Sequence, residues 1–190
     1  YSGSTNISAG TLKAGNTSAL GSNSTTTVNG TLDLGGFNIS LGSLAGTGLV
    51  TDSATTANTL TVGNLGAATT FSGVIQNGNG TVSLTKVGTG TQTLTGANTY
   101  SGDTTISAGV LNISGTGSLG GGSYAGTIVN NGGLVFDTST NQLLTGVISG
   151  TGSLTQSGAS TLTLTGANTY SGSTTISNGT LDLVANGALG

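Results

Sequence analysis

The chain repeats one 21-residue phrase three times, and this repetition constrains its fold more than any other feature. The copies occupy residues 1–21, 100–120 and 170–190, and ten of the 21 positions are identical in all three. The last two copies belong to a longer match, because residues 80–113 and 150–183 align at an offset of 70 with 23 of 34 positions identical. A chain that repeats in this way is typical of an array of stacked units. The repetition therefore favours an architectural role over a chemical one.

The composition excludes several classes of function. Charged residues are 7 of 190, about 4%, whereas an ordinary soluble domain carries roughly 25%. The chain has no His, Cys or Arg, so it cannot build a Ser/His/Asp or Cys/His triad or a thiolate metal site. Without clustered positive charge we expect no nucleic-acid partner. Without a run of about 18 apolar residues we expect no membrane insertion of this segment.

Short alternating runs rich in Thr, Val, Ile and Leu, bounded by Gly and Asn, predict β-strands. The runs are residues 30–35, 59–62, 81–85, 91–95, 153–155, 161–165 and 180–184. Alternation in the run 161–165 places Leu162 and Leu164 on one face of the strand and the three threonines on the other. Asp33 and Asp182 each fall between two leucines, so we expect both side chains on the solvent face.

Turn signals arrive every six to twelve residues, with no helical pattern between them. This spacing leaves an antiparallel sandwich or barrel and a solenoid as the possible architectures. Recurrence of an identical phrase favours the solenoid, because equivalent residues can then stack in register along one axis. At about 20 residues per coil the chain makes roughly nine coils. The offset of 70 corresponds to about three and a half such coils, which requires coils of unequal length.

Two segments carry a resemblance to a known family. Residues 80–102 (GTVSLTKVGTGTQTLTGANTYSG) and 150–172 (GTGSLTQSGASTLTLTGANTYSG) each continue into Thr-Thr-Ile-Ser-x-Gly-x-Leu. They resemble the autotransporter passenger-associated β-strand repeat, strongly over 80–120 and 150–190 and partly over 1–21. The resemblance implies a right-handed parallel β-helix, exported across the outer membrane of a Gram-negative-type cell and displayed as a stalk or adhesive rod.

We therefore expect an all-β chain that forms a right-handed parallel β-helix, or β-solenoid, of roughly nine coils. Residues 1–190 are expected to form one continuous solenoid, with repeated units that start near Tyr1, Tyr100 and Tyr170. We expect this segment to be a fragment of a longer repetitive chain.

Candidate catalytic and ligand-binding groups are few. The five carboxylates lie at least 19 residues apart, at Asp33, Asp52, Asp103, Asp137 and Asp182, whereas a glycosidase needs two acids within about 5–10 Å. The glycine-rich segments 120–124 and 131–134 lack the Asp of the calcium-binding nonapeptide. We predict no catalytic residue, no cofactor-binding residue and no metal site, and therefore not an enzyme.

Three tyrosines and two asparagines recur at fixed places in the repeat. Tyr1, Tyr100 and Tyr170 are expected to cover a corner of the solenoid with the hydroxyl group at the surface, rather than to stack against bases or sugars. Asn98 and Asn168 are expected to form corner turns or amide ladders. Sugar attachment is possible at eight Asn-x-Ser/Thr sequons, of which five or six would arise by chance: Asn6, Asn16, Asn23, Asn29, Asn38, Asn79, Asn112 and Asn178.

These observations predict an extracellular structural module, a β-helical stalk or adhesin at the surface of a Gram-negative-type bacterium. One alternative is a subunit of a self-assembled extracellular filament, because open solenoid ends can template further strands. A second is an ice-binding solenoid, for which residues 25–27, 91–95 and 161–165 would supply the threonine rungs. The expected partners are copies of the chain itself, joined end to end or laterally, or surface glycans or proteins of a host or neighbouring cell.

Overall fold

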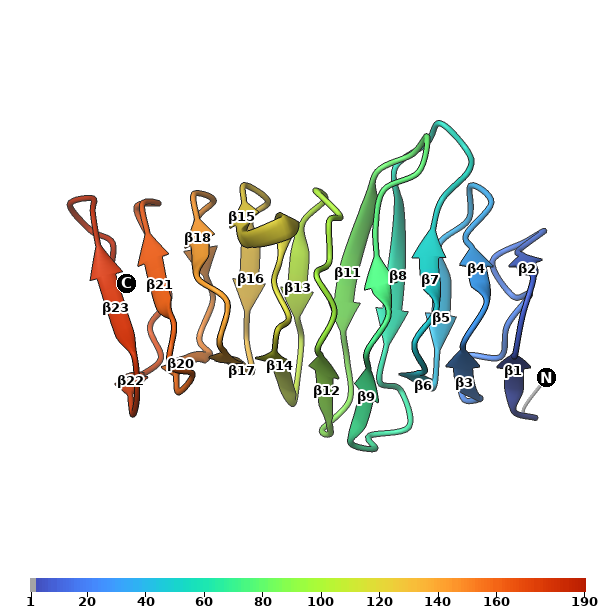
Figure 1. Ribbon diagram of the computed structural model, residues 1–190, viewed down its shortest axis with the longest axis horizontal. Coiled ribbons are helices and arrows are strands. Elements are labelled where there is room, and N and C mark those ends of the chain that lie inside the picture. Colours follow the sequence, from blue (N-terminus) through green and yellow to red (C-terminus); the bar gives the residue numbers. More distant parts are fainter. Residues whose placement is uncertain (1–2) are drawn as a thin grey trace.

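The computed structural model describes residues 3–190, which form an elongated stack of coils with the two ends of the chain at opposite ends of the stack (Figure 1). The described chain contains 23 β-strands and one short 3₁₀ turn, η1 (Gly120–Gly122). Every strand pairing within residues 3–190 is parallel. The prediction of an all-β parallel solenoid of about nine coils is confirmed.

The strands of successive coils form three faces along the stack, although some coils lack a strand on one face. Face I contains β1 (Thr5–Ile7), β3 (Thr25–Val28), β6 (Ser43–Ala45), β9 (Thr69–Phe71), β12 (Thr91–Leu94), β14 (Val110–Gly115), β17 (Gly133–Thr138), β20 (Ser153–Gln156) and β22 (Thr174–Ile176). Face II contains β2 (Thr11–Lys13), β4 (Thr31–Asp33), β7 (Leu49–Thr51), β10 (Val74–Ile75), β15 (Ser123–Tyr124), β18 (Gln142–Leu144), β21 (Thr161–Leu164) and β23 (Thr180–Leu183). Face III contains β5 (Ile39–Leu41), β8 (Asn58–Val62), β11 (Val82–Lys86), β13 (Thr104–Ile106), β16 (Ile128–Asn130) and β19 (Ile148–Ser149).

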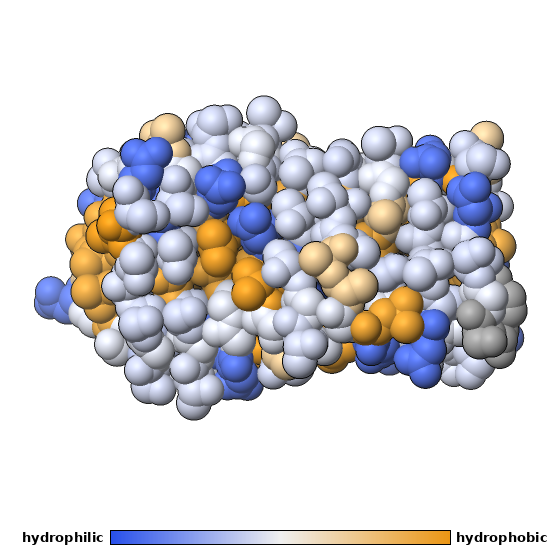
Figure 2. Space-filling view, turned by 90° about the horizontal axis from the view of Figure 1, so that it is seen from below, coloured by the Kyte–Doolittle hydropathy of each residue, from blue (hydrophilic) through white to orange (hydrophobic). Residues whose placement is uncertain are grey.

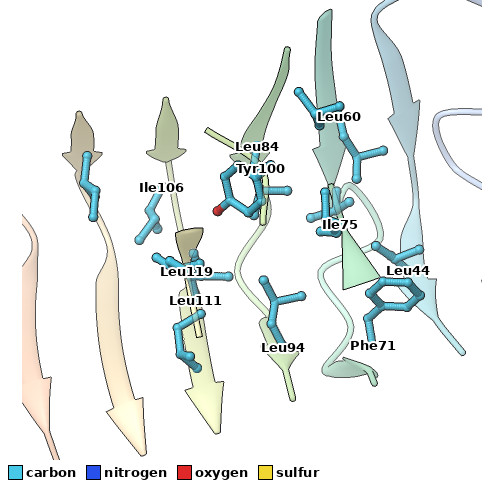
Figure 3. Close-up of a cluster of buried hydrophobic side chains, with 14 of the residues drawn as sticks. Leu44, Leu60, Phe71, Ile75, Leu84, Leu94, Tyr100, Ile106, Leu111 and Leu119 are labelled. Carbon is cyan, nitrogen blue, oxygen red and sulfur yellow. The ribbon is translucent and has the colours of Figure 1, made fainter. Parts of the chain in front are cut away.

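The interior is a thin column of apolar side chains that stack coil upon coil. On face III, for example, Ile39 lies beside Leu60 and Leu60 beside Leu84 in the next coil, and all three are buried. Figure 3 shows this packing in the middle of the stack, where Leu60 and Leu84 point toward the same interior as Phe71. Strand alternation produces this arrangement, because every second residue points inward. Leu162 and Leu164 are buried as the sequence predicts.

Buried amides continue the stack where a coil lacks a strand. At residues 97–100 on face II, the Asn98 side-chain oxygen accepts a hydrogen bond from Ile75 N in the preceding coil, at 2.9 Å. The Asn98 amide nitrogen donates to the carbonyl oxygen of Ser118 in the following coil, at 3.2 Å. Asn168 makes the same two kinds of bond, to Ile148 N and to the carbonyl oxygen of Ala188. Both side chains therefore bridge the backbones of neighbouring coils, and Asn98 also donates to Gly96 O two residues earlier, as in the expected corner turn. They bond to backbone atoms rather than to each other, so they do not form an amide ladder.

The sequence repeat and the structural repeat have different lengths. The first strand of the segment 80–102 is β11, which lies on face III. The equivalent strand 70 residues later is β20, which lies on face I. Ten strand positions lead from β11 to β20, namely β12, residues 97–100 and β13 to β20, and three positions make one coil. The offset is therefore three and one-third coils of about 21 residues rather than three and a half. The repeated sequence led us to expect that identical residues of the two copies stack on one another. In the structure they lie one face apart instead.

Glycines at the corners let successive coils approach one another closely. A Cβ atom added to Gly73 would overlap the carbonyl oxygen of Gly48 in the preceding coil, and one added to Gly48 would overlap that of Gly30. Backbone atoms therefore fill the space that a side chain would need. This explains why Gly recurs at the corner between faces I and II in consecutive coils.

Candidate functional site

The structure brings two of the five aspartates into neighbouring coils. Asp33 pairs in register with Thr51, so Asp52 follows in the next coil at the corner between faces II and III. One oxygen of Asp52 accepts hydrogen bonds from Gly36 N at 2.9 Å and Ala54 N at 3.1 Å. Its other oxygen accepts from the Asn58 side-chain amide at 2.7 Å. Asp52 is fully buried, and its hydrogen bonds show that it fixes the corner.

Asp33 does not lie on the solvent face, so that prediction is wrong. The side chain is only 8% exposed, because β4 ends at Asp33 and the chain turns at Gly35, which lets the carboxylate fold over the corner. Its Oδ1 accepts hydrogen bonds from Gly35 N and Ser53 N, both at 2.9 Å. Lys13 Nζ lies 3.8 Å from its other oxygen. Asp182, in contrast, is exposed as expected.

The pKa of Asp33 lies below its ordinary value. Burial acts to raise this pKa, but hydrogen bonds from the side chain and backbone of Ser53 and from Gly35 N, together with the charge of Lys13, outweigh it. The group is therefore a carboxylate at neutral pH, committed to backbone amides. Asp103 and Asp137 are exposed and bond elsewhere, Asp103 accepting from Thr127 N and Asp137 from Ser114 Oγ.

Lys86 is a buried cation whose burial no feature of the sequence pattern predicts. Its side chain is 0% exposed, and Nζ donates to the carbonyl oxygens of Val87, Gly88 and Ala108 at 2.6, 2.8 and 3.2 Å. Burial lowers the pKa of Lys86 below its ordinary value. Gln156, at the equivalent position of the next copy, donates from Nε2 to the carbonyl oxygens of Gly158 and Ser160 at 3.0 and 2.9 Å. A long side chain with a terminal donor thus satisfies the turn carbonyls in both copies.

The tyrosine hydroxyl groups lie inside the solenoid rather than at its surface, so that expectation is also wrong. Tyr100 is fully buried, and its hydroxyl oxygen lies 2.9 Å from Thr104 Oγ1, which in turn lies 2.8 Å from the Tyr124 hydroxyl oxygen. The two rings meet edge to face with centroids 5.6 Å apart. Tyr170 repeats the arrangement with Thr174, at 2.7 Å, while Tyr1 lies outside the described residues.

Burial raises the pKa of both Tyr100 and Tyr124. The phenols therefore stay protonated and act as structural donors. A sequence signal for the pairing existed, because Tyr and the Thr four residues later are identical in every copy of the phrase. The hydroxyl pairing fills the core at a place where a thin apolar column has few large side chains.

An open groove of about 680 Å³ runs along the corner between faces I and II across the first four coils. Uncharged residues line it: Ser8, Ala9, Gly10, Thr11, Asn29, Gly30, Thr31, Thr47, Gly48, Leu49, Val74 and Gln76. No motif in the sequence marks this groove. Its lining residues come from coils that share strand rhythm but few identical residues.

The threonine runs do not form one flat ladder. Residues 25–27 and 91–95 lie on face I in β3 and β12, whereas residues 161–165 lie on face II in β21. On face I, β6 and β9 separate the first two runs, and Ala45 stands beside Thr27 in register. An ordered water-binding plane with a threonine rung in every coil is therefore not present among the described residues.

Residues 3–190 contain no group of three or more acidic or other metal-ligating side chains placed to hold a metal ion. In the same part of the chain, no helix has the length and apolar character needed to cross a membrane. The surface is mostly of intermediate hydropathy, as the predominantly pale face in Figure 2 shows, with apolar atoms gathered toward the C-terminal end. The exposed apolar side chains at that end are Ile176, Leu183, Val184 and Leu189.

Comparison with known proteins identifies the repeat. A family model described as a passenger-associated-transport-repeat matches residues 1–14, 84–113 and 154–183. The adhesin BmaC autotransporter of Brucella suis biovar 1 (strain 1330) is 49% identical over 90 residues, which are 47% of this chain and 3% of that adhesin. No solved structure matches the chain.

Within residues 3–190, equivalent strands of the first and third matched segments lie on the same faces, β1 and β22 on face I and β2 and β23 on face II. The second segment is shifted by one face, with the equivalent strands β13 on face III and β14 on face I. The resemblance to the passenger-associated repeat, which the sequence predicts, is confirmed by the family model and by the similar stretch of the adhesin. Three segments of this chain therefore match the passenger-associated-transport repeat.

Proposed function

We propose that the chain is a segment of a surface-displayed autotransporter passenger and works as a non-enzymatic adhesive rod at the surface of a Gram-negative bacterium. The observation that carries this proposal is a passenger-associated repeat built into a continuous parallel stack. The similarity to an adhesin supports it over about half of this chain. The matched region is only 3% of that adhesin. We therefore propose, as a separate step, that the present segment itself takes part in adhesion.

The described side chains support a scaffold rather than a reaction. Asp33 and Asp52 are committed to backbone amides, and Lys86 to backbone carbonyls. Catalysis would need such groups to face a substrate instead. Outward Thr, Ser and Asn side chains keep the rod hydrated without charge, and the stacked interior makes it continuous.

The alternative functions have less support. Ice binding would require a threonine rung in every coil of one face, and on face I the coils of β6 and β9 interrupt the two runs while the third run lies on face II. A self-assembled filament would join copies through their open ends, and neither the repeat nor the adhesin relative favours that arrangement.

Display of the chain on a non-adherent bacterium would test the proposal. Bacteria that present residues 1–190 should adhere to cultured epithelial cells in greater numbers than bacteria with the display scaffold alone. The Gly73→Ala variant, in which the added methyl group blocks coil stacking, is a matched control that should adhere no better than the scaffold. Equal adhesion by the intact chain and the empty scaffold would contradict the proposal.

A further inference from the structure

We propose that the groove over coils one to four binds a short stretch of neutral glycan, laid along the solenoid axis. This inference rests on the proposed adhesive function and names the class of ligand for it. The groove holds about 680 Å³ and is lined from four consecutive coils. At about 4.8 Å per coil its lining spans about 14 Å, the length of a short oligosaccharide.

The groove exists because its floor lacks side chains. Gly10, Gly30 and Gly48 occupy the corner in three successive coils, where no Cβ atom fits at Gly30 or Gly48. One wall is a column in register, in which Thr11, Thr31, Leu49 and Val74 stand side by side. Asn29 and Thr47 stand at the floor's other edge, held together because Asn29 Oδ1 accepts from Thr47 N at 3.2 Å.

Several polar groups in the groove are free to bind a ligand. Within residues 3–190, the side chains of Ser8, Thr11, Thr31 and Gln76 make no hydrogen bond to the protein. The Asn29 side chain uses its oxygen for Thr47 but leaves its amide nitrogen unbonded in the same part of the chain. Hydroxyl and amide groups can both donate and accept, which suits the hydroxyl groups of a sugar. Leu49 and Val74 add an apolar strip for the faces of the rings.

An extended peptide fits this groove less well. Peptides that add to a sheet bind through unpaired backbone groups at a strand edge. Here the floor amides are already occupied, because Gly30 N bonds to Ile7 O, Gly48 N to Val28 O, and Leu49 N to Gly30 O, each at 2.8 Å. The lining has no charged residue, so an acidic or basic ligand gains no ion pair. A neutral, hydroxyl-rich ligand is the class that the groove favours.

Binding of defined oligosaccharides to the purified chain tests the proposal. The probes are maltotetraose, cellotetraose, mannotetraose and chitotetraose, with tetragalacturonate as an acidic comparison and an uncharged Gly-Ser peptide as a peptide comparison. We expect at least one neutral tetrasaccharide to bind with saturation in calorimetry, and the other two probes not to bind. Absence of binding by all four neutral sugars up to about 10 mM would overturn the proposal. Binding by the peptide alone would overturn the glycan assignment.

Variants locate the binding. Gln76→Ala and Asn29→Ala should each weaken the affinity about fivefold to tenfold by removing a hydrogen bond, and Thr31→Trp should abolish binding by filling the groove. Asn131→Ala is the matched control, because Asn131 accepts from Thr151 N at 3.2 Å just as Asn29 accepts from Thr47 N, yet lies outside the groove. Equal losses in the Asn29→Ala and Asn131→Ala variants would contradict the location.

The same variants separate this proposal from the proposed function. One outcome is that bacteria that display the Thr31→Trp variant adhere to cells as well as bacteria that display the original chain. In that case the groove is not the adhesive site, and the adhesive function stands. If the purified chain binds a tetrasaccharide but the displayed chain confers no adhesion, the groove stands and the adhesive function fails.

Discussion

Lys86 and Gln156 occupy the same position in two copies of the repeat, and each points its terminal nitrogen into the core from a different face of the solenoid. Lys86 Nζ bonds three turn carbonyls from face III, and Gln156 Nε2 bonds two from face I. The same local chemistry therefore works on either face. The repeat specifies a strand, a turn and the donor that satisfies the turn, and does not specify a side of the rod.

The first prediction concerns the donor at this position. Lys86→Gln should leave the free energy of unfolding within about 1 kcal/mol of the original value, because an amide can replace the ammonium group as it does at Gln156. Lys86→Met should lower it by about 2–3 kcal/mol, because buried carbonyls lose their donor. Urea denaturation measures both. A Met variant as stable as the Gln variant would show that the carbonyls do not need the donor.

The second prediction concerns alkaline pH. The folded-state pKa values of Tyr100 and Tyr124 are raised above the unfolded value of about 10, so the folded chain retains protons that the unfolded chain releases. Their contribution to stability is present below pH 10 and is lost as the pH rises above it, by up to about 1.4 kcal/mol per pH unit for each group.

Lys86 acts in the opposite sense, because its lowered pKa makes stability rise with pH up to about 10.5. The measurement is therefore made in the Lys86→Gln background, by urea denaturation between about pH 8 and 12. The variant that also carries Tyr100→Phe and Tyr124→Phe should show a flatter alkaline decline. If the free energy of unfolding fell equally steeply with pH in both variants, the buried phenols would not control the alkaline loss of stability.

The third prediction concerns acidic pH. The pKa of Asp33 is lowered in the folded chain, so its contribution is present above the unfolded value of about 3.8 and is lost as the pH falls through the folded-state value. Asp33→Asn should reduce the loss of stability below pH 4, as measured by thermal unfolding at a series of pH values. Asp182→Asn, at an exposed carboxylate on the last strand, controls for the removal of one carboxylate, and an equal effect of the two variants would contradict the prediction.

The fourth prediction concerns the corners. Gly73→Ala should destabilise the chain by about 3 kcal/mol or more, because the new methyl group would overlap the carbonyl oxygen of Gly48. Gly15→Ala should change stability by less than about 1 kcal/mol, because nothing lies within 4 Å of its Cβ position. Chemical denaturation of the two variants measures the difference. Similar stability of both variants would contradict the close approach of the coils.

The sequence predicts the architecture well because a solenoid is built from local signals. Alternation in runs such as 161–165 defines the strands, and glycines define the corners. The face on which each copy lies could not be predicted, because the coils differ in length. Over 70 residues these differences add up, so the number of coils between two copies does not follow from the sequence. Only the register, for example Lys86 beside Ile106, assigns a strand to its face.

The polar interior was harder to predict. Asp33 and Lys86 follow the pattern of ordinary strand residues, and their burial depends on turn amides and carbonyls contributed by neighbouring coils. Tyr100 and Thr104 could have been paired from their constant spacing in the phrase. The groove depends on an alignment of Gly30 with Gly48 that follows from register rather than from local sequence.

Disulfide formation between engineered cysteines tests the parallel stack most directly, because the chain has no cysteine of its own. Thr85 and Thr105 lie side by side in successive coils on face III, whereas Thr105 and Asn112 lie on different faces and would be opposite one another in an antiparallel hairpin. The account predicts that the Thr85→Cys/Thr105→Cys variant oxidises to an intramolecular disulfide while the folded Thr105→Cys/Asn112→Cys variant stays reduced. The reverse pattern would contradict it.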